Sequence, residues 1–515
     1  MITLQRCLTQ VLLVLSKSVQ QYFTRSPAFN CCFWMMLGSG AYLLSCSFCM
    51  ALGFGCMMLS AYNLPSKQTL WIYIQGLSLG VFGFLYTHLC DAPALPQNAH
   101  LHGSGIFHVQ EKKETTLFGK KALYYKGVLK TFTDTHGTIY KNIPGSIRRP
   151  LHKPLCQSDK IFLSSLELIV KDTRQFSIKL SNTLQGDPAS RGYCFTHMRY
   201  LAKNTLLKRL QPFYEDKKTY AFISAMVAGY LDNKTLMYEF SKTGIQHLLT
   251  ISGFHFSLLM MFLTAIFKPW MPKKVFVFIL CLFLTLYVIY LGPSPSVSRS
   301  WIAALLWLVA YSVEIPSHPI NYLSIGAILA FLENPLCLTQ MGFQFSYLAT
   351  FGILSYYCLC DRWMSWIIPT RHASVLKSCK LPKRIFFAFL ILIRKSLALD
   401  HAVNLITLPV IYYHFESFPY FSFYFNLLIP ALLLPSLYLL LIGLLCAPFS
   451  VVEQSMHTLN HLYTKSILDS VAACPKILEI SLVIKNIKAL QALAALILIF
   501  LALLVYTERS YADEV

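Results

Sequence analysis

The chain has 515 residues, of which 55% are hydrophobic and only 13% are charged, and 44 Lys and Arg against 23 Asp and Glu give a net charge of +21. A soluble domain carries about 25% charged residues, so this composition excludes a soluble globular enzyme, a disordered chain and a secreted disulfide scaffold. Residues 31–62 and 418–452 hold no charge at all. About 20 apolar residues suffice to cross the hydrocarbon of a bilayer, so the sequence predicts a polytopic membrane protein.

The N-terminal residues 1–91 are predicted to hold the first transmembrane segments. One long span or two short ones fall within 33–59, and another falls within 70–89. No cleavable signal peptide is predicted, because the start of the chain lacks a short apolar core followed by a small-residue cleavage site.

Residues 92–190 are predicted to form a soluble insert. Alternating stretches separated by Gly and Pro predict a small β-barrel or sandwich, with strands at 121–133, 137–144, 160–170 and 174–180. Between Asp91 and Lys218 there are 21 basic and 10 acidic residues. Such an excess beside a membrane indicates contact with anionic lipid headgroups, which composition favours, or with a polyanion such as nucleic acid.

Two of the 16 cysteines, Cys156 and Cys194, lie in this polar part of the chain, whereas most of the others lie in apolar segments and are expected to pack as small side chains. Cys156 and Cys194 could form a disulfide if the insert lies outside the cytoplasm. Two unpaired thiols are the alternative.

Residues 191–227 are predicted to form amphipathic connecting helices. Within 194–210, the apolar face would carry Phe195, Met198, Leu201, Leu206 and Leu210, and the basic face Arg199, Lys203, Lys208 and Arg209. A basic amphipathic helix favours a position on the membrane surface, and direct contact with a ligand is the alternative.

The C-terminal part, residues 228–515, is predicted to be a membrane domain. Its candidate spans, many of them short or interrupted by Pro or Gly, are 247–267, 275–291, 301–313, 322–332, 341–358, 385–393, 402–415, 420–445 and 489–506. The whole chain would have about ten spans, some broken or re-entrant. Irregular backbone at membrane depth is tolerated only where it is buried in protein or lines a wet cavity, so the pattern predicts an α-helical bundle with a pore or transport path.

The basic residues Lys268, Lys273 and Lys274 and the segment 362–384 favour cytoplasmic loops. Because the number of spans before the insert is uncertain, the side of the membrane on which the insert lies stays open.

We predict no metal and no cofactor. A G-x-x-x-x-G-K-[ST] phosphate loop is absent from the sequence, so the chain has no nucleotide cradle of its own. His100 and His102 are not followed by an Asp-His pair. His457 and His461 would share a helix face, but two ligands are too few for a zinc site.

The segment 228–258 reads AGYLDNKTLMYEFSKTGIQHLLTISGFHFSL and places four unusual residues in an apolar stretch: His247, Ser252, Gly253 and His255. Polar side chains are costly in lipid, so they should face a cavity or a partner helix. Close helix packing at Ser252 and Gly253 is the alternative.

This segment resembles the signature of the ComEC family, the competence DNA-uptake channels of the bacterial inner membrane. Three later elements are similar to that family in the same order: GPSPSVSR at 292–299, MGFQFSYLAT at 341–350, and Thr407-Leu-Pro409 followed by Phe425-Asn426 and Pro430. In this family a small OB-like β domain precedes the membrane domain, which fits the position of the insert. Many relatives end with a metallo-β-lactamase-like domain, which we do not expect here, so a separate nuclease would degrade the other strand.

The resemblance implies a multi-pass protein of the bacterial inner membrane that is not an enzyme and takes up single-stranded DNA during natural transformation. Its partners would be the lipid bilayer, a DNA-receptor protein outside and a helicase-like ATPase inside, and a homo-oligomer is an open alternative. Arg299, in the Pro-Ser-rich start of a helix, would contact phosphate, unless it is an interfacial arginine that snorkels. His247, Ser252, Gly253 and His255 would form or gate the narrow part of the DNA path, with plain helix packing as the alternative. Gln344, Ser346 and Asn426 would line the path, with interhelical hydrogen bonds as the alternative.

Two other classes of function stay open. A polytopic transporter of a small solute or lipid would also need broken helices, but it should not depend on the basic insert. An intramembrane hydrolase could use Ser252 with His255, yet Gly253 between them argues against that geometry, and no third group is evident to orient the histidine.

Overall fold

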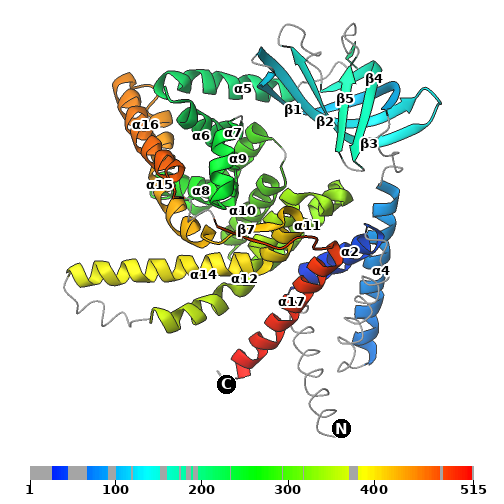
Figure 1. Cartoon of the computed structure of the whole chain (residues 1–515). Coiled ribbons are helices and arrows are strands. Elements are labelled where there is room, and N and C mark those ends of the chain that lie inside the picture. Colours follow the sequence, from blue (N-terminus) through cyan, green and yellow to red (C-terminus); the bar gives the residue numbers. More distant parts are fainter. Residues whose placement is uncertain are drawn as a thin grey trace. The chain divides into compact units, whose positions relative to one another are not determined.

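The computed structural model (Figure 1) describes residues 26–43, 66–90, 100–117, 120–150, 159–172, 175–180, 187–188, 195–231, 233–292, 294–316, 318–369, 381–475 and 480–512. The chain divides into two compact units. The first, called the helical unit, comprises residues 1–90, 237–281 and 295–515, and the second, called the β unit, comprises residues 91–236 and 282–294.

The β unit is built on an antiparallel sheet whose strand order is β3-β2-β1-β4-β5, with β6 paired to β4. The strands are β1 (His100–Leu117), β2 (Lys120–Asp134), β3 (Ile139–Pro150), β4 (Lys160–Asp172), β5 (Gln175–Leu180) and β6 (Asp187–Pro188). β3 and β5, at the two ends of this order, also approach each other, so the sheet curls. A small β domain is confirmed, and its OB-like assignment stays a prediction.

The sequence did not predict the central strand, β1, because its composition is polar and interrupted by Gly103 and Gly105. Both glycines are required by the close approach of β2: an added Cβ would collide with the carbonyl oxygens of Thr133 and Thr131. The pairing registers of β1 shift nearby, as expected where a strand bends. Glycine here marks a tightly curved strand rather than a turn.

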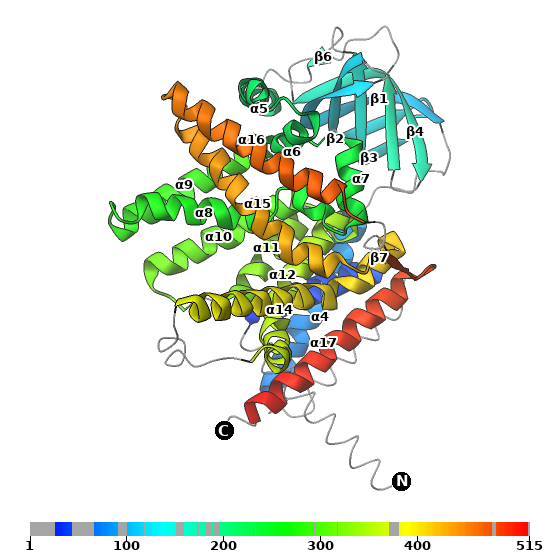
Figure 2. The same cartoon turned by 60° about the vertical axis from the view of Figure 1, so that its left-hand side comes forward.

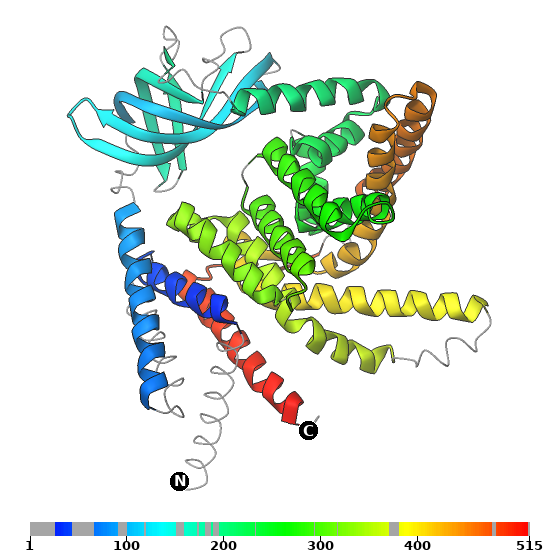
Figure 3. The same ribbon diagram turned by 180° about the vertical axis from the view of Figure 1, so that it is seen from behind.

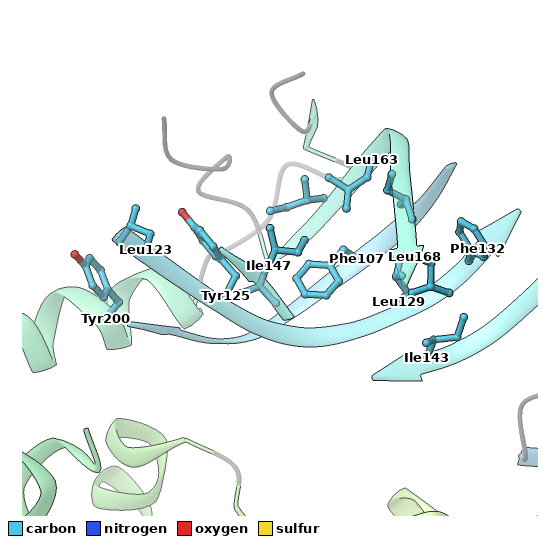
Figure 4. Close-up of a cluster of buried hydrophobic side chains, with 13 residues drawn as sticks. Phe107, Leu123, Tyr125, Leu129, Phe132, Ile143, Ile147, Leu163, Leu168 and Tyr200 are labelled. Atoms are coloured by element: carbon cyan, nitrogen blue, oxygen red, sulfur yellow. The ribbon is translucent and has the colours of Figure 1, made fainter. Parts of the chain in front are cut away.

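The core of the β unit lies on the inner face of the curled sheet (Figure 4). Alternate residues of the strands point inward, and Phe107, Leu129, Phe132 and Leu168 are fully buried in this cluster. Burying such a side chain contributes about 1.5–3 kcal/mol relative to leaving it exposed, so the period-two pattern of β2 and β4 accounts for much of the folding energy here.

After the sheet come α5 (Phe195–Leu210), η1 (Gln211–Phe213) and α6 (Lys217–Ala228). The predicted faces of the first helix are wrong. α5 buries Thr196, Tyr200 and Lys203 and exposes Phe195 and Met198. The reason is that α5 packs on β1: Tyr200 joins the sheet core and its hydroxyl donates to Glu114 (2.7 Å). The expected position of α5 on the membrane surface stays a prediction.

The β unit also contains the C-terminal end of helix α9 (Lys273–Leu291). Arg199 Nε donates to the carbonyl oxygen of Ile289 (2.8 Å), and Lys203 Nζ donates to that of Leu291 (2.8 Å). The last carbonyls of a helix lack intrahelical donors and carry partial negative charge, so cations stabilise this end. Arg199 Nη1 also donates to Gln110 O of β1 (3.2 Å), so one side chain joins the sheet to the end of α9.

The helical unit contains most of the remaining helices (Figures 2 and 3). They are α2 (Pro27–Leu43), α4 (Ser66–Cys90), α7 (Lys234–Lys242), η2 (Gln246–Leu249), α8 (Gly253–Phe267), α10 (Pro295–Val313), α11 (Pro319–Glu333), η3 (Pro335–Thr339), α12 (Met341–Ile367), α14 (Leu381–Phe415), α15 (Ser422–Leu445), α16 (Ser450–Ala472) and α17 (Ala489–Ala512). A short antiparallel pair joins β7 (Ser417–Pro419) to β8 (Ser481–Val483).

Within the described part of the chain, α9, α10 and α15 are long and apolar enough to cross a membrane. Shorter apolar helices occur at 74–90, 253–267, 319–333 and 491–500. The structure is therefore mostly helical with apolar segments suited to a bilayer, and the count of about ten spans stays a prediction.

One pair of predicted spans is wrong: 385–393 and 402–415 belong to a single helix, α14, with Pro409 inside it. In the structure Arg394 is buried, and its Nε lies 3.0 Å from Asp361 Oδ1 on α12. A buried cation with a partner on the neighbouring helix does not interrupt a helix.

Close packing fixes two helix pairs. α12 lies against α14, where an added Cβ at Gly352 would meet the carbonyl of Ala402. α2 lies against α4, where a Cβ at Gly38 would meet the carbonyl of Gly80. Small residues at such crossings permit the backbone contacts that hold helices together in lipid.

Candidate functional site

The candidate site is centred on Arg299, in the first turns of α10. Its Nε donates to Ser346 Oγ on α12 (2.8 Å), and its Nη2 donates to Ser300 Oγ (3.2 Å). A guanidinium has five N–H donors. Three of these have no acceptor among the residues that the structure describes, so an anionic ligand that reached the guanidinium could accept from them.

The start of α8 lies directly against this guanidinium. A Cβ added at Gly253 would lie 2.9 Å from Arg299 Nη2 and 3.1 Å from Ser300 Oγ. Glycine at this position therefore allows the side chain of Arg299 to reach the first turn of α8. The cation and the dipole of a helix start both attract negative charge, so together they form a favourable environment for an oxyanion.

Ser252 and His255 form the N-terminal cap of α8. Nδ1 of His255 accepts the backbone N–H of Ser252 (3.2 Å) and lies 3.2 Å from Ser252 Oγ. This reciprocal arrangement is a capping box, which satisfies donors that the first turn leaves open. The apolar segment is interrupted at Ser252 and Gly253, where α8 starts after the short turn η2.

Of the sequence-predicted residues, the structure thus brings together Ser252, Gly253, Arg299 and Ser346, with His255 in the same capping box. His247 lies in η2, and its carbonyl accepts from the Thr250 hydroxyl (2.8 Å) at the turn into α8. Residues 252–255, 299 and 346, which are far apart in the chain, therefore meet in the candidate site around Arg299.

Gln344 and Asn426 make contacts elsewhere. Gln344 Nε2 donates to Leu338 O (2.7 Å), and its Oε1 lies 2.7 Å from His414 Nε2 of α14. Asn426 Nδ2 donates to Asp400 Oδ1 (3.1 Å), which joins α15 to α14. These are the interhelical hydrogen bonds that the sequence analysis held as the alternative.

Three residues of interest were missed from the sequence. Tyr347, next to Ser346, stacks on Phe343 with ring centroids 4.3 Å apart. His414 and Asp400 are polar residues within an apolar helical segment, and that signal would have found them, because such residues are costly in lipid and usually functional.

A second cluster lies on the β unit, where three residues stand directly opposite one another on β1, β2 and β3: Lys113, Tyr124 and Arg148. Lys113 Nζ is 5.3 Å and Arg148 Cζ 5.7 Å from the centroid of the Tyr124 ring. We call these three residues the cationic ladder. Two cations over one aromatic ring offer a phosphate two positive charges, and the ring offers a base a stacking surface once a cation moves off it.

A buried cluster of basic and aromatic side chains lies behind this ladder. Lys112 Nζ is 4.7 Å from the Tyr200 ring centroid and 3.3 Å from His197 Nδ1. Lys203 lies over the ring of Tyr230 at 4.7 Å. Burial lowers the pKa of Lys203 to about 8, although Glu111 acts in the opposite direction. Burial likewise lowers the pKa of His197, and Lys112 adds to that effect.

Cys156 and Cys194 lie outside the described residues, so their pairing stays a prediction. Within the described ranges, no group of three or more His, Cys, Asp or Glu side chains is placed to hold a metal ion.

Comparison with known proteins gives a family match. The model of the family described as competence protein matches residues 230–509, which is more than half of the chain. ComE operon protein 3 of Bacillus subtilis is 29% identical over 136 residues, covering 26% of this chain and 17% of that protein. Two uncharacterized proteins are each 30% identical to this chain over the matched residues. The match to the MG316 homolog of Mycoplasma pneumoniae covers 27% of this chain and 37% of that protein, and the match to MG316 of Mycoplasma genitalium covers 30% of this chain and 41% of that protein.

The chain therefore spans less than half the length of each of these relatives. No solved structure matches it.

Proposed function

Since the chain belongs to the competence protein family, as the ComEC resemblance predicted, we propose that it acts in competence and DNA uptake. It would form a multi-pass channel in the bacterial inner membrane for single-stranded DNA. A strand carries one negative charge per nucleotide, and such charges do not enter hydrocarbon unaided. A channel must offer polar contacts that are strong enough to admit the strand and weak enough to release it.

The observation that carries the proposal is the surroundings of Arg299. Its guanidinium keeps three donors for a phosphate while Ser346 fixes its orientation and Gly253 leaves it room. A snorkelling arginine would instead extend along the helix toward water, with no need for a partner on α12 or for a glycine beside it. Ser252 and His255 then form the rigid start of α8 next to the passing phosphate.

The β unit would receive the strand before it enters. α9 begins beside Lys268, Lys273 and Lys274, a basic cluster that favours the cytoplasm. It ends in the β unit, where Arg199 and Lys203 bind its last carbonyl oxygens. If α9 crosses the membrane once, the β unit lies outside, and the cationic ladder faces DNA that arrives there.

Other parts of the proposal come from the family alone. A DNA-receptor protein outside would deliver the strand, and a helicase-like ATPase inside would draw it in. Assembly as a homo-oligomer belongs to the same proposal.

The second candidate is a transporter for a small solute or lipid, which would use the same broken helices. The cationic ladder favours DNA over this candidate, because a small solute needs no cation-flanked aromatic ring on a soluble domain. The hydrolase reading is disfavoured, because the Ser252–His255 contact is that of a helix cap.

The test uses a strain that lacks this protein and has no redundant channel. Genes for the wild type, Arg299→Ala and Lys465→Ala, an exposed charge on α16, are returned. Labelled DNA is supplied, and nuclease-protected cytoplasmic label is scored separately from label held outside. We expect Arg299→Ala to lose at least about ten-fold of the protected label, as for a lost charge-assisted contact, while Lys465→Ala resembles the wild type. Unchanged protected label in the deletion strain would sink the channel proposal.

A further inference from the structure

A pocket of about 350 Å³ lies where α9 begins and α10 ends, within the helical unit. The side chains that give it chemical character are Lys273 from α9 and Trp307, Tyr311 and Glu314 from the end of α10. None of them belongs to the site around Arg299 or to the cationic ladder.

The pocket holds one charge of each sign against an aromatic wall. Lys273 Nζ donates to Glu314 Oε1 (2.6 Å) and lies 4.8 Å from the Tyr311 ring centroid. Trp307 and Tyr311 stack with centroids 5.5 Å apart. The two charged side chains are 35% and 80% exposed. An ion pair this exposed is worth little, so a ligand can open it and use both charges.

The backbone holds the acidic side chain in place. Glu314 has a φ of +62°, and the N–H of Ile315 donates to Ala310 O (3.1 Å) as the helix ends. Glycine is the usual residue at such a left-handed helix end, because a Cβ is unfavourable there. The left-handed backbone is therefore unfavourable for Glu314, whose carboxylate nevertheless lies beside Lys273.

The pocket lies where two helices that could span a bilayer adjoin. α9 and α10 are both long and apolar enough to span it, and the pocket lies at their adjoining ends. Trp307, Tyr311 and Ile315, which line the pocket, are themselves exposed large hydrophobic side chains. A ligand with its polar part in the pocket would therefore have apolar surface for a hydrocarbon tail.

We propose that this pocket binds the headgroup of a zwitterionic phospholipid with a primary ammonium, of the phosphatidylethanolamine class. The phosphate would pair with Lys273, and the ammonium would pair with Glu314 and lie over the ring of Tyr311 or Trp307. The presence of Glu314 argues against the other occupants. A nucleic acid strand or an anionic lipid would gain from Lys273 but would be repelled by the carboxylate beside it.

The proposal is independent of DNA transport. The test uses the full chain, purified in detergent and stripped of lipid, with phosphatidylethanolamine or phosphatidylglycerol added back. Native mass spectrometry counts bound lipid. We expect the wild type to bind more phosphatidylethanolamine than phosphatidylglycerol. Glu314→Gln should bind about five-fold less phosphatidylethanolamine but as much phosphatidylglycerol as the wild type, and Lys273→Ala should bind less of both lipids. Lys274→Ala, one residue along α9 and outside the pocket, is the matched control and should resemble the wild type.

Glu314→Gly separates binding from folding, because glycine relieves the left-handed backbone while it removes the carboxylate. It should fold at least as well as the wild type and still lose the preference for phosphatidylethanolamine. Wild-type affinity for that lipid in Glu314→Gly would overturn the proposal. So would a wild-type preference for phosphatidylglycerol, or displacement of bound phosphatidylethanolamine by an oligothymidine, which would assign the pocket to the strand.

Discussion

Arg299 and Gly253 depend on each other at the scale of single residues. The space that a Cβ at Gly253 would occupy is filled by the guanidinium of Arg299, and Ser346 orients that guanidinium from the other side. The glycine would thus serve DNA passage without touching the strand, by allowing a cation to reach the first turn of α8.

We therefore predict that Gly253→Ala impairs DNA uptake even though it adds one methyl group. The new Cβ would lie 2.9 Å from Arg299 Nη2, so it must move the guanidinium away from the first turn of α8. Because this weakens a charge-assisted contact with the strand, we expect a loss of about five-fold or more in protected label. Gly342→Ala on α12 is the control, because its Cβ would meet only Pro295 Cγ at an ordinary 3.8 Å. The same nuclease-protection measurement checks both, and equal uptake by the two variants would contradict the assigned role of Gly253.

The buried Lys203 should make the stability of the folded protein depend on pH. Burial lowers its pKa in the folded protein to about 8, below the value of about 10.4 in an unfolded chain. Between these pH values the unfolded chain binds the proton that the folded protein has released, so stability rises with pH across this window. Below pH 8 both states are protonated and the dependence disappears.

The measurement is thermal unfolding of the purified protein from pH 7 to 9.5, compared with Lys203→Met, which keeps the length of the side chain without the charge. The wild type should gain at most about 2 kcal/mol relative to the variant by pH 9.5. A difference between the two that is constant with pH would show that Lys203 does not titrate as its buried position requires.

At the scale of elements, three strands together build a surface that none of them has alone. Lys113, Tyr124 and Arg148 are 11 and 24 residues apart in the chain, and only the antiparallel register of β1, β2 and β3 places them in a row. A slip of β2 by one residue would turn Tyr124 toward the core and away from Lys113 and Arg148, so the hydrophobic pattern of β2 also determines the position of the ladder.

Because of this geometry we predict that Tyr124→Ala weakens the binding of an oligothymidine to the full chain by about five-fold or more, as expected for the loss of one stacked base. Tyr124→Phe, which keeps the ring, should retain most of the affinity.

Lys113→Ala should reduce the slope of log affinity against log salt concentration by about 0.7, because one fewer phosphate is neutralised. Fluorescence anisotropy in detergent measures both. Equal affinities of Tyr124→Ala and the wild type would remove the ladder from the DNA path.

At the scale of the whole molecule, sequence reasoning identified the family and the residues that meet around Arg299, because those residues sit in short motifs whose chemistry is unusual in an apolar segment. It could not identify the faces of α5, since the burial of Lys203 depends on carbonyl oxygens of α9 that lie almost ninety residues away. It divided α14 in two, because the partner of Arg394 is on another helix. The pocket at Lys273 and Glu314 was equally hidden, because it arises only where two helix ends adjoin.

The most direct test of the central claim is electrical. The purified full chain is inserted in a planar bilayer, oligothymidines of increasing length are added on the side of the β unit, and the ionic current is recorded. A DNA channel predicts current blockades whose duration grows with the length of the oligothymidine and whose frequency falls in Arg299→Ala. Current that is unaffected by any oligothymidine, in bilayers that contain correctly folded protein, would contradict the claim that this chain conducts a DNA strand.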